Sequence, residues 1–79
     1  MILRGYKKFH HREKNKDYHV LNFTDPFQDQ KGIGEEFVTE FVNEKIFAAL
    51  RPEFIGKNVD LIKSDKFATG FYVEGKKVL

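Results

Sequence analysis

The sequence contains no cysteine, which excludes a disulfide framework and a thiolate metal site. It has only two prolines, and it has no run of eighteen apolar residues, the length that a membrane-crossing helix needs. The first residues, Met1 to Arg4, lack the apolar run of a signal peptide. We therefore expect a soluble cytoplasmic protein without a membrane partner, stabilised by packing and by any partner subunit.

The hydrophobic residues are numerous enough for one folded core. At 79 residues the chain has room for a single compact domain, and 41% of the residues are hydrophobic. Nine phenylalanines and three tyrosines are a high aromatic share for so short a chain. We expect residues 1–79 to form one binding domain rather than a disordered segment.

The charges are unevenly distributed, although the net charge is only +2. Residues 1–24 hold six basic and two acidic side chains together with all three histidines, whereas residues 25–45 hold six acids and two lysines. Residues 46–79 return to six basic and four acidic side chains. The first third is thus the part that attracts anions, although the same lysines would also serve simply to keep a small protein in solution.

Two runs near the start, Leu3 to Arg12 and Tyr18 to Thr24, predict a β-hairpin, because the residues between them are polar and turn-prone. Side chains alternate between the two faces of a strand. In the first strand this rule separates a mixed set from a more cationic and aromatic set. The mixed set is Leu3, Gly5, Lys7 and Phe9, and the cationic and aromatic set is Arg4, Tyr6, Lys8 and His10.

Residues 35–50 permit two interpretations. Their apolar residues follow helical spacing, which predicts one long helix and a ββαββ arrangement of the α+β class. Alternatively, Glu36 to Val42 form a third strand, and a short helix begins at Asn43 as its N-cap and ends near Arg51, before Pro52. We prefer the second interpretation because the residues from Phe37 to Val42 are rich in β-formers.

The rest of the chain predicts two more strands. Asp25 to Gly34 is a connection, and Ile55 to Lys63 is a turn that leads into a fourth strand. Asp65 to Gly70 is expected to be a loop before a fifth strand at Phe71 to Glu74. Three strands, one short helix and two strands is the order of the OB-fold, a five-stranded barrel. We therefore expect a mainly β protein with a five-stranded OB-fold-like barrel and one short helix between strands 3 and 4.

Three segments resemble the small single-stranded-DNA-binding proteins of phages and mobile elements. They are the run from Lys16 to Phe23, the pair Phe41-Val42 ahead of the helix, and the turn and strand from Ile55 to Leu61. In size the chain is similar to the gene V-type proteins of filamentous phages. The resemblance implies a homodimer that coats single strands in phage or plasmid replication or transfer, with DNA favoured over RNA.

Binding of single strands needs cations for the phosphates and aromatic rings for the bases. We expect the bases to stack on Tyr6, Tyr18 and Phe67, although both tyrosines would also suit a purely structural position at the barrel wall. The candidate binding residues are Arg4, Tyr6, Lys8, His10, Arg12, Lys14, Lys16, Tyr18, Lys66 and Phe67. The phenylalanines expected in the core are Phe9, Phe23, Phe37, Phe41, Phe47 and Phe71.

Neither a metal site nor a catalytic site is expected, and no cofactor. His10 and His11 are neighbours on one strand and point to opposite faces, so they are poorly placed to share a zinc ion. Glu35 and Glu36 are likewise neighbours, which disfavours a paired acid and base. The alternative to nucleic-acid binding is a protein-interaction or inhibitor module that uses the acidic surface of residues 25–45.

Overall fold

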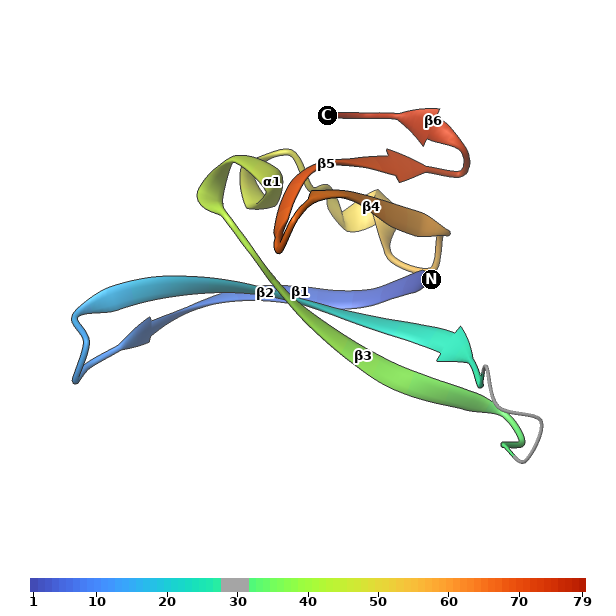
Figure 1. Ribbon diagram of the computed structural model, residues 1–79, viewed down its shortest axis with the longest axis horizontal. Coiled ribbons are helices and arrows are strands. Elements are labelled where there is room, and N and C mark those ends of the chain that lie inside the picture. The colour runs from blue at the N-terminus through green and yellow to red at the C-terminus, as the bar shows by residue number, and fades with distance from the viewer. Residues whose placement is uncertain (28–31) are drawn as a thin grey trace.

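The computed structural model describes residues 1–27 and 32–79, and it is mainly β. Within these described residues, six strands and two short helical segments follow one another (Figure 1). They are β1 (Ile2–His11), β2 (Lys16–Pro26), β3 (Glu35–Val42), α1 (Glu44–Ala48), η1 (Pro52–Phe54), β4 (Val59–Ser64), β5 (Phe67–Val73) and β6 (Lys76–Lys77). The strands form two antiparallel three-stranded sheets, in the orders β1-β2-β3 and β4-β5-β6.

Residues 35–50 form a strand followed by a short helix. The preferred interpretation of this segment is therefore confirmed, and the prediction of one long helix is wrong. Asn43 is the N-cap, because its Oδ1 accepts a hydrogen bond from the Ile46 backbone N–H at 2.9 Å. Helix α1 ends at Ala48, a little earlier than the expected end near Arg51, and η1 begins at Pro52.

The loop expected at residues 65–70 is wrong, because β5 already begins at Phe67. Strands β4 and β5 are joined by a tight turn in which Asp65 takes a positive φ of 57°. Gly70 lies inside β5 rather than in a loop. A Cβ at this position would clash with the backbone oxygen of Leu79. The glycine therefore marks a place where two chain segments nearly touch.

The two sheets meet along the start of β1. Leu3 donates a backbone hydrogen bond to Lys57 at 3.0 Å and accepts one from Gly56 at 2.7 Å, and Val59 donates to Met1 at 2.8 Å. In residues 1–27 and 32–79, no strand ladder joins β3 to β5 on the other side. The two sheets therefore form no closed barrel, and the expected five-stranded barrel is not confirmed.

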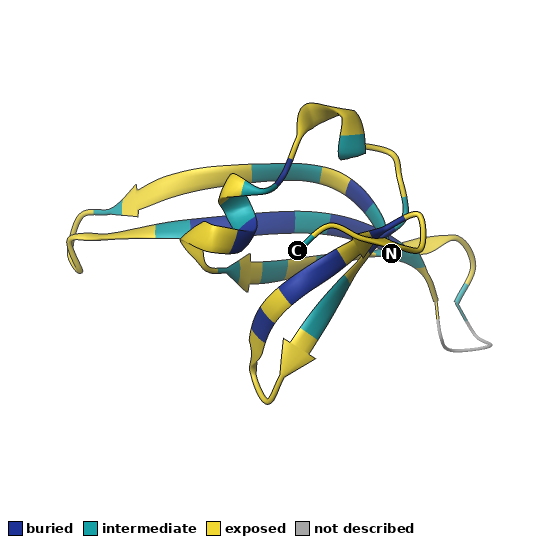
Figure 2. Ribbon diagram, turned by 90° about the horizontal axis from the view of Figure 1, so that it is seen from above, coloured by how far each residue is buried: buried dark blue, intermediate teal, exposed yellow. Residues whose placement is uncertain are grey.

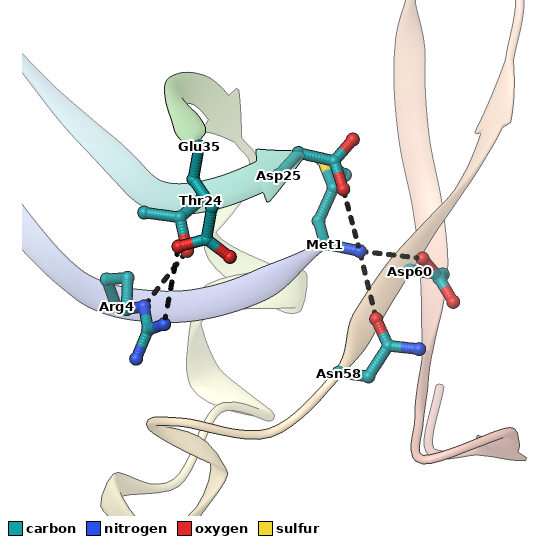
Figure 3. Close-up of polar contacts among 7 residues, drawn as sticks. All are labelled: Met1, Arg4, Thr24, Asp25, Glu35, Asn58 and Asp60. Carbon is teal, nitrogen blue, oxygen red and sulfur yellow. Dashed lines mark hydrogen bonds and ion pairs between the residues drawn. The ribbon is translucent and has the colours of Figure 1, made fainter. Parts of the chain in front are cut away.

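The amino group of Met1 lies beside side chains from both sheets (Figure 3). Its nitrogen is 2.9 Å from Asn58 Oδ1, 3.4 Å from Asp60 Oδ1 and 3.8 Å from Asp25 Oδ1. Asp25 belongs to β2, whereas Asn58 directly precedes β4 and Asp60 lies near its start. These polar contacts fix the start of β1 between the two sheets.

The core lies between the two sheets, and Figure 2 shows the buried segments gathering near the middle of the molecule. Its largest fully buried side chains are Phe23, Phe71, Leu3, Leu21, Ile46 and Val59. Of the phenylalanines expected in the core, Phe23 and Phe71 are buried, and Phe47 is half-buried against the core. The expectation is wrong for Phe9, Phe37 and Phe41, which are 37%, 81% and 62% exposed.

The exposure of these phenylalanines is explained by the position of their strands in the sheet. β1 and β3 are the outer strands of their sheet, and only one face of that sheet meets the core. Along β3 the exposed residues alternate with half-buried ones, and Phe37 and Phe41 fall on the exposed face. Their hydrophobicity suggested burial, but their register in the sheet decides which way they point.

Candidate nucleic-acid interface

A β-bulge in β1 changes which residues share a face. Leu3 pairs with Phe23, and Gly5 pairs with the next residue of β2, Asn22, so Arg4 is an extra residue without a partner. From Tyr6 onward the alternation is therefore shifted by one position. The face away from the core, which we call the outer face, is formed by Arg4, Lys7, Phe9 and His11 of β1, Lys16, Tyr18, Val20, Asn22 and Thr24 of β2, and Glu35, Phe37, Thr39 and Phe41 of β3.

The expectation that Arg4, Tyr6, Lys8 and His10 share one face is therefore wrong. Tyr6 lies on the core side, where its ring packs edge-on against Phe47 at 5.6 Å and is half-buried. Lys8 and His10 also lie on this side, and both contact Asp17, at 3.7 Å and 2.9 Å respectively. A stacking role for Tyr6 does not fit this position. The bulge has no clear signature in the sequence, although glycine in a strand can mark one.

Three aromatic rings instead form a continuous row across the outer face, one from each strand. The rings of Phe9 and Tyr18 are stacked, with their centroids 5.5 Å apart and their planes 25° apart. Phe41 meets the other side of Tyr18 edge-on at 6.1 Å. Tyr18 was expected to bind bases, whereas Phe9 and Phe41 were expected in the core. The register of the three strands is what brings the rings together.

Two lysines lie over this aromatic row. The Nζ atom of Lys7 is 5.9 Å from the centre of the Phe9 ring, and that of Lys16 is 5.7 Å from the centre of the Tyr18 ring. Both distances permit a cation–π contact. Lys7 and Lys16 are exposed, so their ammonium groups remain able to meet an anion beside the rings.

Arg4, by contrast, is already engaged on the outer face. Its Nε donates to Thr24 Oγ1 at 3.0 Å, and its Nη2 is 3.9 Å from Glu35 Oε2 (Figure 3). Glu35 therefore offsets part of the positive charge of Arg4, which was expected to contact a phosphate. The β1–β2 turn at the other end of the hairpin carries a net positive charge, since Arg12 and Lys14 are exposed there beside a single exposed acid, Glu13.

The acidic residues of β3 mostly point away from the outer face. Glu36 and Glu40 pair with Asp25 and Leu21 on the core side of the sheet, and Glu40 is held by Lys63 of β4 at 2.9 Å. Asp25 lies 3.8 Å from the Met1 amine. The acidic surface expected over residues 25–45 is thus partly paired with cations, and part of it lies outside the described residues.

An open hollow of about 450 Å³ adjoins the aromatic row. β3 ends opposite His19, so residues Lys16 to Tyr18 of β2 have no partner on the side where β3 would otherwise pair. The hollow lies between this free edge of β2, the start of α1 and the start of β5. Its lining includes Tyr18 and Phe41 of the aromatic row and, from β5, Phe67, which is 75% exposed. Three expected binding residues, Lys16, Tyr18 and Phe67, thus line one cavity.

The remaining expected residue, Lys66, lies in the β4–β5 turn next to Phe67 and is exposed. Of the histidines, His11 lies 6.1 Å from the Tyr18 ring on the outer face, whereas His19 is buried and packs on Phe47 at 4.8 Å. Over residues 1–27 and 32–79, the structure brings together no group of three or more side chains that could hold a metal ion.

One carboxyl group near the interface has a shifted pKa. The hydrogen bond from His10 lowers the pKa of Asp17 below its ordinary value of 3.8, and the nearby Lys8 acts in the same direction. Asp17 therefore stays ionised at neutral pH, and together with Glu44 it places negative charge in the lining of the hollow beside Lys16.

Comparison with known proteins yields no relative: no family model, no curated protein and no solved structure matches the chain. No helix in the part of the chain that the structure describes is long and apolar enough to cross a membrane.

Proposed function

We propose that this protein binds single-stranded nucleic acid, DNA in preference to RNA, across the outer face of β1, β2 and β3. The observation that carries the proposal is the row of Phe9, Tyr18 and Phe41, with Lys7 and Lys16 over its rings. Unstacked bases need aromatic faces, and the phosphates between them need cations at short range. Such a surface does not distinguish one base from another, so binding tolerates any sequence.

The bases stack on the aromatic row, and the strand continues toward the hollow, where Phe67 offers a further ring. Lys7, Lys16, Arg12 and Lys14 neutralise phosphates along the same line. In this proposal the protein coats single strands in phage or plasmid replication or transfer, as the small OB-fold proteins that it resembles do. The order of the elements and the joining of β1 to the start of β4 support that likeness.

The proposal is tested by titrating a fluorescent oligo-dT at several salt concentrations, with oligo-rU as a second ligand. Four neutralised phosphates at about 0.7 each predict that log affinity falls with log salt at a slope of about 3. Between about 50 and 200 mM salt the affinity should therefore fall roughly 50-fold. Absence of oligo-dT binding at the lowest salt contradicts the proposal, and tighter binding of oligo-rU contradicts the preference for DNA.

A charge-reversal pair separates this surface from a general effect of charge. Replacement of Lys7 and Lys16 by glutamate should weaken oligo-dT binding more than tenfold and reduce the salt slope by about 1.4. The matched control replaces Lys76 and Lys77 by glutamate, since these exposed residues lie on β6 of the other sheet. Equal losses for the two double variants would show that net charge, and not the outer face, governs binding.

A further inference from the structure

The lining of the hollow contains one cation and one carboxylate that form no ion pair with the described residues. They are the ammonium group of Lys16 and the carboxylate of Glu44, the first residue of α1. None of the ion pairs found within residues 1–27 and 32–79 includes either group. Both side chains are exposed, so both groups can meet a ligand that enters the hollow.

The other polar side chains of the lining are already engaged. Asp17 Oδ1 lies 2.9 Å from His10 Nδ1, and the side chain of Asn43 caps α1. His19 is buried, and its ring packs against an aromatic neighbour. Glu44 is therefore the carboxylate of the lining that can accept new hydrogen bonds.

The walls around these two charges are largely aromatic. Tyr18 and Phe41 meet edge-on at 6.1 Å, and Phe67 reaches the hollow from β5. At about 450 Å³ the hollow falls within the usual size of a ligand pocket, roughly 300 to 1,000 Å³. Tyr18 and Phe41 also belong to the aromatic row, so a base in the hollow would follow directly on a base stacked on the row.

We propose that the hollow takes one base of the bound strand and prefers guanine at this position. Glu44 accepts hydrogen bonds from the Watson–Crick edge of the base, and Lys16 meets the adjoining phosphate. This inference rests on the proposed function, because the base arrives as part of a strand held on the outer face. The aromatic row tolerates any base, whereas the hollow adds a preference at a single position.

The preference for guanine follows from the chemistry of a carboxylate, which only accepts hydrogen bonds. The unpaired guanine edge presents N1–H and the N2 amino group side by side, and these two donors match the two carboxylate oxygens of Glu44. Adenine and cytosine present one amino group beside a ring nitrogen that is itself an acceptor. In thymine the single N3–H lies between two carbonyl oxygens, which repel a carboxylate.

The preference is tested with an oligo-dT of about twelve nucleotides and the same oligonucleotide with one central dG. A good two-donor contact discriminates between bases by about 5- to 150-fold. The lower value applies to an open site, so the dG oligonucleotide should bind about fivefold more tightly than oligo-dT. A central dA, or a deoxyinosine that lacks the N2 amino group, should raise the affinity less than twofold.

Each outcome of this comparison has a definite meaning. If the dG oligonucleotide binds no more tightly than oligo-dT, the guanine preference is wrong and the proposed function stands. If dA or deoxyinosine gives the same gain as dG, stacking of a larger ring explains it and the role of Glu44 is wrong. If neither oligo-dT nor the dG oligonucleotide binds, the proposed function fails and the guanine preference fails with it.

A change of one residue tests the assignment to Glu44. Glu44→Gln keeps the size of the side chain and removes the carboxylate, so the affinities for the dG oligonucleotide and oligo-dT should come within twofold of each other. Binding of oligo-dT should change less than twofold, which also shows that the variant is folded. The matched control is Glu53→Gln, which removes an acid from the first turn of η1, outside the lining of the hollow, and should keep the fivefold preference. Loss of the preference in both variants, or in neither, contradicts the assignment.

Discussion

Removal of the central ring of the aromatic row is expected to weaken nucleic-acid binding and also to lower the stability of the fold. Tyr18 contacts Phe9 on one side and Phe41 on the other, and Lys16 lies over its ring. Tyr18→Ala therefore removes the ring on which the stacking surface depends. Tyr18→Phe keeps the ring and removes only the hydroxyl group.

The size of the effect follows from the energy of base stacking. Loss of one stacking ring costs about 1 to 3 kcal/mol of binding free energy, which corresponds to a roughly 5- to 150-fold weaker affinity for oligo-dT. Each aromatic pair adds about 0.5 to 1.5 kcal/mol to stability, so two lost pairs would lower the free energy of unfolding by about 1 to 3 kcal/mol. Tyr18→Phe should change the affinity less than twofold.

Fluorescence anisotropy at constant salt measures the affinity, and urea unfolding measures the stability of each variant. The control is Tyr72→Ala, which removes a partly exposed tyrosine from β5, in the other sheet. The reasoning is refuted if Tyr18→Ala is folded and binds oligo-dT as tightly as the unchanged protein. It is also refuted if Tyr72→Ala loses as much affinity as Tyr18→Ala.

Three further predictions concern the fold and one carboxyl group. Gly70→Ala should be strongly destabilised in thermal unfolding, because its Cβ would clash with the backbone oxygen of Leu79. Gly5→Ala is the control, because a Cβ there has nothing within 4 Å, so this variant should unfold almost as the unchanged protein. Similar melting temperatures for the two variants would contradict this reasoning. Asn43→Ala should lose about 0.5 to 2 kcal/mol in urea unfolding through loss of the α1 cap, and an unchanged midpoint would show that the cap adds nothing. Carboxyl NMR titration should place the pKa of Asp17 below 3.8, and His10→Ala should raise it. Because the pKa of Asp17 is lowered in the folded protein, this contact stabilises the fold at pH values above the unfolded-state pKa, and its contribution is lost as the pH falls through the native pKa. If His10→Ala leaves the titration of Asp17 unchanged, the lowered pKa is not caused by His10.

The local elements could be predicted from the sequence because their signals are local. β-formers from Phe37 to Val42 and the capping amide of Asn43 indicated a strand and then a helix, and both are present. Gly70 was misinterpreted as part of a loop, because a close approach to the distant Leu79 backbone is not visible in its neighbours along the chain.

The candidate site could be predicted only in part. Lys16, Tyr18 and Phe67 were expected to bind together and do line one hollow, but Tyr6 was placed on the wrong face. One unpaired residue, Arg4, is enough to cause this error, because a shift of one position exchanges the two faces of a strand.

The sequence by itself determined the mainly β composition, the short capped helix and the cationic first hairpin, since each depends on residue types and their near neighbours. The tertiary structure alone decided that the two sheets stay open and that Phe9 and Phe41 flank Tyr18 outside the core. The physical reason is that hydrophobicity favours burial of any phenylalanine, whereas strand register and edge position determine which rings find a core to enter.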